Sequence, residues 1–590
     1  MDAAAILNFS EKRAGLLLSA ALMISLLLIG AAGGRIGAIG PDGDDVMRLV
    51  QVRELLAGQG WFDLRQPRLG PEGGTLMHWS RLVDLPMVLI TLLLTPLIGE
   101  EAALAAAITL WPVLSIAFVS AAIVIGARAL SPAGSEARTL LLFAALIAVA
   151  MLFRHFRFLP GAIDHHNLQL GMIGLAMALL LDPARRAVAS ALAGLVLAGA
   201  VAIGADIYPF VALIAVFVAL DWAVAGRPAE SGTAAFGTGF ALGLSVCFAV
   251  TVAPDDYALV FCDALSSITF LAGATGGLGL ALAARASLPG GWTTRFALLG
   301  LIAAACGGLA LVFAPHCLSN PLSALPPEVQ TLWLARVDEA LPTLALMDGQ
   351  VSEVAFRLGP ALAGLGAAIW LLALRPEARR SMSLLGLLCL AALILSLYQT
   401  RFYVFGHVFA ILPLAALAAR LHAGAVAGAP RLAYLAVLAL SLPFLWAAVG
   451  GPFDRPAAPA ASDAGQCDLA EAIRLLNTLP EGRILAPASD TPRLLLDTRH
   501  SALNGHYHRN AAGTAAAIGI FTGPPEAAGP AIRSAGVTYV LHCPADPDLG
   551  FFARHAPGGF IASLQSGETP AWLAPLKAGG GYTIYRADTP

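Results

Sequence analysis

Long apolar segments, separated by short polar ones, make up most of the chain. Many of them approach the roughly 20 apolar residues that a helix needs to cross a bilayer. The pattern predicts about thirteen membrane-spanning helices, at 14–32, 102–125, 139–153, 168–181, 188–203, 208–225, 236–252, 268–284, 296–313, 354–374, 382–397, 404–419 and 432–449. The apolar piece 85–98 is too short for a clear span, and we expect it to lie at the membrane interface or to dip into it.

After residue 450 the pattern changes. A stretch rich in Pro, Ala and Ser reads as a linker, and the residues beyond it alternate between helical and extended periodicity. We expect helices at 468–479 and 530–535, the latter between Pro530 and Gly536, and strands at 483–487, 537–542 and 582–586. This alternation predicts a small α/β domain. The predicted organisation is therefore a transmembrane domain at 1–450 that includes a first outer loop at 39–84, a linker at 451–465, and the α/β domain at 466–590.

The composition agrees with a polytopic α-helical membrane protein. The 590 residues are 58% hydrophobic and 12% charged, and the mean hydropathy is +0.76. Such values exclude an ordinary soluble protein. The net charge of −3 gives no sign of a nucleic-acid partner. Lys12 and Arg13 precede a first apolar run that is longer than a signal-peptide core, so we interpret it as a span rather than as a cleaved leader.

Arginines in the short loops predict the orientation of the spans. Every second loop carries them, which places the N-terminus in the cytoplasm by the positive-inside rule: Arg128, Arg138, Arg185, Arg186, Arg227, Arg285, Arg295, Arg375, Arg379, Arg380, Arg420 and Arg431. The loops 40–84, 154–169, 254–267, 314–352 and 399–403 then lie outside, together with the α/β domain. We expect a bacterial inner membrane, with the α/β domain in the periplasm.

Seven cysteines divide between the two environments. Cys247, Cys306 and Cys389 fall inside spans, where they are expected to be inert packing residues. Four others lie on the outer side, where disulfides can form: Cys262, Cys317, Cys467 and Cys543. Four cysteines allow three pairings, and the sequence does not choose among them.

The first outer loop, 40–84, concentrates charge in a chain that has little. Apolar residues recur at helical spacing from Val46 to Ala57, which predicts a helix lying in the membrane interface. Asp44 and Asp45 come just before its first turn. They suit chemistry at the membrane surface, and one of them equally suits the N-cap of this helix. The spacing does not decide which aspartate is the reactive one.

A second polar stretch, 154–169, is predicted on the same face. Asp164 and His166 stand two residues apart at the start of a helix, and with Asp44 they can share a divalent ion. Mg²⁺ prefers oxygen ligands, whereas a site with one histidine also suits Mn²⁺. The alternative is a capped helix end with surface histidines.

Several arginines lie on the outer side, against the positive-inside rule: Arg48, Arg53, Arg154, Arg157 and Arg401. An anionic ligand is one reason for such a placement. Pairing with the local aspartates is an equally good one.

These stretches resemble the GT-C fold of membrane glycosyltransferases, and among them the catalytic subunit of oligosaccharyltransferases. The run D-D-V-M-R-L-V-Q-V-R resembles the family's first motif, with Asp44 as its key aspartate and Arg53 as its arginine. Asp164-His165-His166 matches the second motif, of the type D-x-H. Gln350-Val351-Ser352-Glu353 resembles the S-V-S-E motif before the tenth span, and Q-T-R-F-Y offers Arg401 for the arginine that contacts the lipid phosphate in that family.

One departure from the family concerns the acceptor. The W-W-D motif that reads the asparagine sequon is absent, and the C-terminal domain has N-G-H-Y-H-R-N at 504–510 instead. This argues against transfer to protein asparagine and leaves a lipid, a glycan or another protein group as the acceptor.

The resemblance and the residues together predict a glycosyltransferase that moves a sugar or oligosaccharide from a polyprenyl-phosphate-type donor on the outer face. We expect Asp44, Asp45 and Glu353 among the catalytic groups, and Asp44, Asp164 and His166 as ligands of Mn²⁺ or Mg²⁺. Seven residues are predicted to bind substrate: Arg53, His78, Arg81, Arg154, His165, Arg401 and His508. The alternatives are a transporter or flippase of a lipid-linked or anionic substrate, which charges deep in the spans would favour, and a sensor, for which thirteen or so spans are more than an anchor needs.

Overall fold

A computed structural model describes residues 3–131, 134–152, 156–286, 291–347, 349–424, 430, 432–455 and 467–587. The chain forms two compact units. The first comprises Met1–Ile39, Ser80–Pro321 and Asp338–Pro456, and the second comprises Gly40–Trp79, Leu322–Val337 and Ala457–Pro590. The first outer loop, which the sequence analysis grouped with the membrane region, therefore has its contacts with the C-terminal residues.

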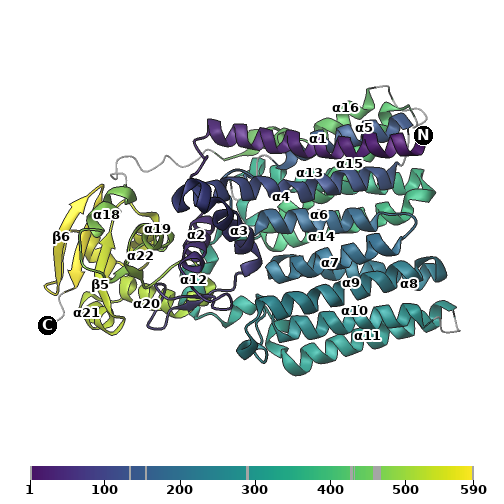
Figure 1. Ribbon diagram of the computed structural model, residues 1–590. Helices are drawn as coiled ribbons and strands as arrows, with labels where there is room; N and C mark the ends of the chain where they lie inside the picture. Colours follow the sequence, from purple (N-terminus) through teal and green to yellow (C-terminus); the bar gives the residue numbers. More distant parts are fainter. Residues whose placement is uncertain are drawn as a thin grey trace. The chain divides into compact units, whose positions relative to one another are not determined.

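The first unit is a bundle of long helices that run side by side (Figure 1). Its α-helices are α1 (Ala3–Ala32), α3 (Arg81–Ile98), α4 (Glu100–Leu130), α5 (Gly134–Leu152), α6 (His166–Leu180), α7 (Ala187–Ile203), α8 (Tyr208–Ala225), α9 (Arg227–Thr251), α10 (Ser267–Arg285), α11 (Gly291–Phe313), α13 (Val351–Leu374), α14 (Arg379–Tyr398), α15 (Tyr403–His422), α16 (Ala433–Leu440) and α17 (Pro443–Gly450). Each of the thirteen predicted spans falls on one of these helices or, for 432–449, on the pair α16 and α17.

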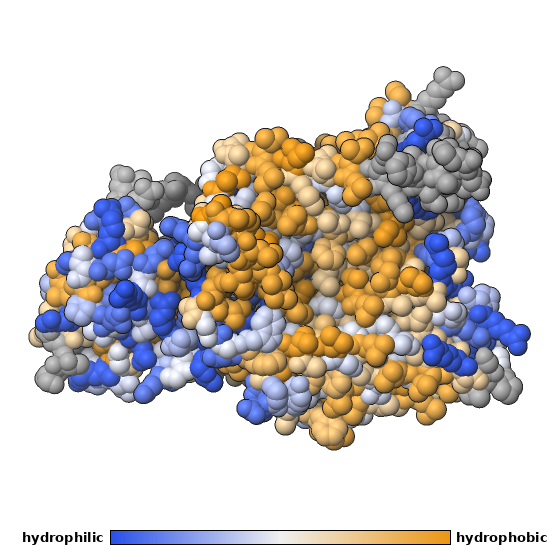
Figure 2. All heavy atoms as spheres, in the orientation of Figure 1, coloured by the Kyte–Doolittle hydropathy of each residue, from blue (hydrophilic) through white to orange (hydrophobic). Residues whose placement is uncertain are grey.

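Ten helices in the described residues are long and apolar enough to cross a membrane: α1, α3, α4, α8, α9, α10, α11, α13, α14 and α15. The pair α16 and α17, bent by 79°, makes an eleventh candidate, and α6 and α7 are shorter apolar helices. The exposed side chains of this unit are largely apolar, as Figure 2 shows, with Leu97 78% and Val224 74% exposed. An apolar exterior of this kind suits contact with lipid rather than with water. The prediction of a polytopic α-helical membrane protein is confirmed.

Helix α3 corrects the interpretation of 85–98. The sequence pattern was judged too short for a span, but the helix begins earlier, at Arg81, after an N-cap in which the Ser80 side chain accepts from the Leu82 N–H. The two charges in its first turn, Arg81 and Asp84, made the apolar run look shorter than the helix is. They form an ion pair with each other, which removes the cost of burying either charge alone.

The second unit is an α/β domain with a smaller lobe from the first outer loop. Its elements are α2 (Gly43–Leu56), β1 (Arg65–Gln66), β2 (Thr75–Leu76), α12 (Pro327–Leu332), α18 (Leu469–Leu476), β3 (Arg483–Leu485), α19 (Thr491–Asp497), β4 (Ser501–Ala502), α20 (Ala511–Thr522), α21 (Pro525–Ser534), β5 (Val537–His542), α22 (Pro547–His555), α23 (Phe560–Gln565), β6 (Leu573–Gly579) and β7 (Tyr582–Ala587). The strand order is β4-β3-β5-β7-β6, with the first three strands parallel and β7 antiparallel to both of its neighbours. The predicted α/β fold of the C-terminal residues is confirmed.

Two hydrophobic clusters cover the sheet of this domain. Val540 of β5 belongs to the cluster with α20, α22 and α23, whereas its neighbours Tyr539 and Leu541 belong to the cluster with α18. Gly536 follows α21 at φ +64°, the left-handed conformation that glycine adopts without strain, and this ends the helix before β5 as predicted. The predicted start is wrong, because α21 begins at Pro525 and Pro530 lies inside it.

Helix α2 differs from its prediction. We expected an amphipathic helix in the membrane interface, but residues 45–52 are all buried. The helix packs against α19, and Met47 and Val50 share an apolar cluster with Leu495 and Tyr507. The N-cap is Asp42, whose side chain accepts from the Asp44 N–H at 3.0 Å, so neither Asp44 nor Asp45 has that role.

Two disulfides resolve the pairing that the sequence left open. Cys262 bonds to Cys317 in the first unit, and Cys467 bonds to Cys543 in the second. Cys247, Cys306 and Cys389 are free and lie in helices α9, α11 and α14, as expected for residues of the spans.

Candidate functional site

Three helix starts bring charged side chains together at one end of the first unit. Asp164 and His165 precede α6, and His166 is its first residue. Asp206 lies in the single turn Ala205–Ile207 that leads into α8, and Arg401 lies in the turn Thr400–Phe402 that leads into α15. Because an apolar helix follows each turn at once, the polar side chains gather where the helices begin.

The five side chains form one continuous chain of contacts. His166 Nε2 lies 3.3 Å from Asp164 Oδ2, and His165 Nδ1 lies 2.7 Å from Asp164 Oδ1. The other ring nitrogen of His165, Nε2, lies 3.5 Å from Asp206 Oδ2. Asp206 Oδ1 in turn lies 3.0 Å from a terminal nitrogen of Arg401. This arrangement alternates bases, carboxylates and a fixed cation across segments that are far apart in sequence.

Neighbouring residues hold this arrangement in place. Gln399 accepts two hydrogen bonds from Arg401 at its side-chain oxygen, at 3.1 and 2.9 Å, which leaves the guanidinium directed by two partners. A Cβ on Gly204 would come within 2.9 Å of the Gln169 side-chain nitrogen and 3.5 Å of the His165 ring. The end of α7 therefore approaches the start of α6 closely at Gly204, where a larger residue would displace the Gln169 side chain.

Part of the cluster has the composition of a metal site. Asp164, His165 and His166 offer ligand atoms that all lie within 4.8 Å of one another. One carboxylate and two imidazoles suit Mn²⁺ or another borderline transition ion better than Mg²⁺, which prefers oxygen. The predicted ligands Asp164 and His166 are brought together, and His165, predicted to bind substrate, joins them. The third predicted ligand, Asp44, belongs to the other unit, and its share in a common site stays a prediction.

Asp206 was missed by the sequence analysis. It stands in a turn of only a few residues between two apolar segments, which looks like a minimal connector. The available signal was a lone carboxylate between two spans on the face that already carried Asp164. Only the contacts with His165 and Arg401, which are distant in sequence, show its importance.

Glu353 is linked to the same end of the bundle. It lies in the first turn of α13, and its carboxylate is 3.6 Å from Arg357, one turn further along. Arg357 also donates to the Thr400 hydroxyl at 2.9 Å. Since Thr400 precedes Arg401 in the chain, Arg357 connects the predicted S-V-S-E-like motif to the turn that carries Arg401.

Other predicted residues belong to the second unit. Asp44 is half-buried and Asp45 is buried, both in the first turn of α2. Arg53 donates to the Leu496 carbonyl at 3.2 Å, a contact between α2 and the end of α19. His78 and His508, predicted independently to bind substrate, have ring centroids 4.5 Å apart.

Two predicted substrate-binding arginines have other outcomes. Arg81 is almost fully buried and pairs with Asp84 at 3.2 Å, and its part in substrate binding stays a prediction. Arg154 lies outside the described residues.

Solved structures show which fold this is. An archaeal oligosaccharyltransferase AglB from Archaeoglobus fulgidus, in complex with an inhibitory peptide and a dolichol-phosphate, matches with a TM-score of 0.62 and 14% identity, over 96% of this chain and 74% of that one. The apo form of an oligosaccharyltransferase from the same organism matches with a TM-score of 0.63 and 16% identity, over 90% and 69%. A structure of that enzyme in complex with Zn and sulfate matches with a TM-score of 0.59 and 14% identity, over 97% and 73%.

Neither a protein-family model nor a curated protein sequence matches the chain. At such low identity the structural likeness establishes the fold alone. The chain has the GT-C fold of these oligosaccharyltransferases, and the resemblance stated from the sequence motifs is confirmed at that level.

Proposed function

We propose that this protein is an integral membrane glycosyltransferase that moves a sugar or oligosaccharide from a polyprenyl-phosphate-type lipid to an acceptor on the extracytoplasmic face. The observation that carries the proposal is the chain of contacts from His166 through Asp164, His165 and Asp206 to Arg401. It combines a cation for a phosphate with carboxylates and imidazoles at the ends of membrane-spanning helices. The GT-C fold supports it, since AglB was solved with a dolichol-phosphate.

An apolar cavity near this chain of contacts supports a lipid donor. It has a volume of about 360 Å³ and is lined by residues of α7, α8, α9, α10 and α11. Tyr208 and Thr269, at the starts of α8 and α10, are among its few polar lining residues, and Tyr208 is two positions from Asp206. A hydrocarbon chain in this cavity would bring its phosphate end toward Asp206 and Arg401. A nucleotide sugar has no hydrocarbon chain that could fill such a cavity.

Arg401 is the group that we assign to the donor phosphate. When the bond between the sugar and the phosphate breaks, negative charge develops on the phosphate oxygen, and a fixed cation stabilises that charge. A guanidinium has five N–H donors, and the contacts of Arg401 with Asp206 and Gln399 leave further N–H groups for a phosphate. The Asp206 carboxylate holds the guanidinium in place through one terminal nitrogen and does not occupy all of its N–H groups.

Asp44 is the aspartate that we favour as base or ligand, over Asp45. An acceptor hydroxyl must lose a proton, and a carboxylate can take it at neutral pH. Asp45 is only 5% exposed inside the second unit, whereas Asp44 is half-buried and retains a surface. We expect Asp44→Ala to abolish transfer without loss of expression. Loss in Asp45→Ala with near-normal transfer in Asp44→Ala would reverse the assignment.

A divalent ion fits Asp164, His165 and His166, and when bound it would supply positive charge near the donor phosphate. His165 Nδ1 lies 2.7 Å from Asp164 Oδ1 and its Nε2 lies 3.5 Å from Asp206 Oδ2, so the two carboxylates orient the ring. The test has two readouts. Mn²⁺ added to chelated protein should raise the melting temperature and restore transfer, and neither should occur in Asp164→Asn. Full activity in chelator would remove the metal from the proposal and leave a metal-free base.

The decisive experiment offers purified protein a panel of polyprenyl-phosphate sugars and nucleotide sugars, with candidate acceptors of lipid, glycan and peptide type. Mass spectrometry of lipid extracts should show consumption of a lipid-linked donor and of no nucleotide sugar. Consumption of a nucleotide sugar without a lipid-linked donor would refute the proposal. Movement of intact lipid-linked sugar across vesicles without any transfer would identify a flippase instead.

A further inference from the structure

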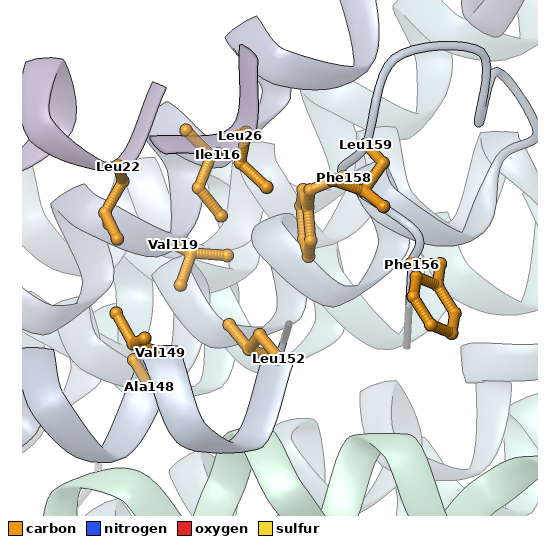
Figure 3. A pocket seen from close by; sticks show the side chains of 10 residues that line it. All are labelled: Leu22, Leu26, Ile116, Val119, Ala148, Val149, Leu152, Phe156, Phe158 and Leu159. Atoms are coloured by element: carbon orange, nitrogen blue, oxygen red, sulfur yellow. The ribbon is translucent and has the colours of Figure 1, made fainter. Parts of the chain in front are cut away.

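The small cavity among α1, α4 and α5 is too narrow for a ligand. Leu22 and Leu26 of α1 line it together with apolar side chains of α4 and α5, as Figure 3 shows. Its volume is about 10 Å³, which is roughly the space that one water molecule needs. A group of polar side chains in the second unit is more informative.

One segment of the second unit comes from the long outer loop between α11 and α13. Residues 322–337, which we call the strap, belong to this unit, whereas the parts of the loop before and after them belong to the first unit. Helix α12 of the strap packs on α20, and its Val329 and Leu332 share an apolar cluster with Phe521. Burial of apolar surface therefore anchors the strap at α12, and polar contacts hold the turn that follows.

Polar side chains join this turn to the α/β domain. The indole N–H of Trp333 donates to Nδ1 of His506 at 2.6 Å, a hydrogen bond that we call the latch. His506 Nε2 lies 3.7 Å from one oxygen of Asp548, and the other oxygen accepts from Arg336 at 2.9 Å. The Arg336 guanidinium also lies over the ring of Phe551, 3.9 Å from its centre.

The latch exists in only one protonation state of His506. An indole nitrogen can only donate, so Nδ1 is the unprotonated nitrogen of a neutral ring, and the proton is on Nε2. A second proton goes to Nδ1 and turns it into a donor, which cannot bond to the Trp333 N–H. Protonation therefore breaks the latch. The alternative role of His506, a base paired with Asp548, requires a free lone pair on the ring, and Trp333 occupies it.

The surroundings of His506 favour the neutral ring. Partial burial lowers the pKa of His506 from its ordinary value of 6.5, Asp548 of α22 raises it, and Arg336 of the strap lowers it again. Asp548 and Arg336 are the charged groups that act on this ring among the described residues. Because the Asp548 carboxylate is already paired with Arg336, it offsets only part of the loss that protonation of His506 causes.

We propose that Trp333 and His506 form a pH-sensitive latch, which holds the end of the strap on the α/β domain while His506 is neutral and releases it when His506 is protonated. Release frees residues 333–337, whereas the apolar contacts of α12 keep the first part of the strap in place. This device does not depend on the proposed glycosyl transfer and can be tested without any donor.

The direction of the pH effect follows from the two states of the latch. A released His506 takes up a proton near pH 6.5, whereas the latched ring does so only at a lower pH. The latch is therefore fully formed above about pH 6.5 and is lost as the pH falls below that value. Each pH unit below the ordinary pKa raises the equilibrium constant for release by up to about tenfold.

The strap continues directly into a segment that contacts the turn of Arg401. Residues 338–347 belong to the first unit, where the Leu341 carbonyl accepts from the Thr400 N–H at 2.7 Å. The hydroxyls of Thr343 and Thr400 lie 3.0 Å apart, and Arg401 is the next residue. The latch is thus only a few residues away from the segment that holds this turn.

Hydrogen–deuterium exchange of the full-length protein in detergent tests the latch. After correction for the intrinsic pH dependence of exchange, we expect the amides of residues 333–337 to exchange about tenfold faster at pH 5.5 than at pH 7.5. Amides of β3 and β5, in the sheet of the same domain, should show no such rise. An equal rise in the two strands would indicate opening of the whole domain, and no rise at 333–337 would show that the latch does not respond to pH. Either result would overturn the proposal.

Two variants of His506 separate the latch from other groups that titrate. In His506→Asn, an oxygen stands at the same position along the side chain as Nδ1 and accepts from Trp333 at any pH, so exchange should stay slow at both pH values. His506→Ala removes the acceptor, so exchange should be fast at both. The proposal is wrong if His506→Asn keeps the pH dependence of the wild type, or if His506→Ala exchanges as slowly as the wild type at pH 7.5.

Discussion

The two ends of the helical unit both carry clusters of charged side chains, and they are built differently. Helices α6 and α8 begin beside the first cluster and reach the second, and α14 begins at the second and leads into the turn that carries Arg401. At one end lie Asp164, His165, His166, Asp206 and Arg401. At the other end, Arg185 donates two hydrogen bonds to Asp221 at 2.8 Å each, and Arg380 donates to the same carboxylate at 2.6 Å.

The cluster around Asp221 has the features of a structural clamp. Its members are arginines and aspartates only, which stay charged near neutral pH. Arg380 also donates to the Leu180 carbonyl at 2.6 Å, so the cluster joins α8 and α14 to the end of α6. Arg185 is held at φ +49°, an uncommon conformation for a residue with a side chain, and the two-fold contact with Asp221 compensates for it.

The cluster around Asp164 has what the clamp lacks. Two histidines provide imidazole rings that can ligate a metal as neutral groups. Its single arginine is shared between Asp206 and a neutral glutamine rather than enclosed by carboxylates. Charge at a helix end is therefore not by itself a sign of function, whereas the mixture of acid, imidazole and an incompletely neutralised cation is.

The sharpest test of this difference uses one substitution at both ends of α6. Asp164→Asn keeps the shape of the side chain and an acceptor for His165, but removes the charge. We expect transfer to fall by on the order of 10²- to 10³-fold, because charge near the reacting phosphate is lost. The measurement is the initial rate with a lipid-linked donor, together with the melting temperature, which should hardly change.

Asp182→Asn is the matched control. Asp182 is 8% exposed, and its carboxylate accepts from the Arg186 side chain, which is 75% exposed and stays in contact with water when the pair is broken. Transfer should stay within a few-fold of wild type. Equal losses of activity in the two variants would contradict the division of the molecule into a reactive end and a clamped end.

For Asp221→Asn we expect the opposite of Asp164→Asn, a loss of stability without a loss of turnover. Removing the charge leaves two partly buried guanidiniums without their common partner, and breaking a buried pair costs about 3–5 kcal/mol. We expect lower yield and a clearly lower melting temperature in detergent, with near-normal turnover for each folded molecule. A variant that is stable but inactive would make Asp221 part of the chemistry and the comparison wrong.

Much of the helical architecture was predictable, because each span is a long apolar run and needs no partner to be recognised. The location of Asp164 and His166 at a helix start was predictable for the same reason. Two long-range features were not. The sequence gives no sign that α2 packs against α19 rather than the membrane, since a buried helix and an interfacial one share the same periodicity. The pairing of Asp206 with Arg401 joins turns about half the membrane region apart, and no local pattern contains it.

Arginine geometry offers a smaller and finer test. Arg401→Lys keeps the charge but loses the planar fork that can bind two oxygens at once. The loss of one charge-assisted hydrogen bond, about 1.5–3 kcal/mol, should raise the KM for the donor about 10- to 100-fold while the KM for the acceptor changes little. Arg380→Lys in the clamp should lower the melting temperature and leave both KM values alone. Reversed phenotypes would show that the phosphate is bound at the other end.

A third kind of charged group is a buried acid that forms no ion pair with a cation among the described residues. It predicts a smaller effect on stability than the two clusters do. Asp490 in the second unit is 8% exposed, and its carboxylate accepts from the Tyr582 hydroxyl at 2.9 Å. Burial raises its pKa to about 7, although the Tyr582 hydrogen bond opposes the shift. The folded protein therefore holds a proton that the unfolded chain, with the ordinary pKa of 3.8, releases. The stabilising effect of that proton is fully present below about pH 4 and is lost as the pH rises through about 7.

We expect limited proteolysis of the C-terminal domain in the full-length protein to be faster at pH 8 than at pH 5.5, and Asp490→Asn, which is neutral throughout, to flatten that dependence. Asp221 differs, because Arg185 and Arg380 stabilise its charged form. If Asp490→Asn shows the same pH dependence as the wild type, the acid that responds to pH lies elsewhere in the C-terminal domain.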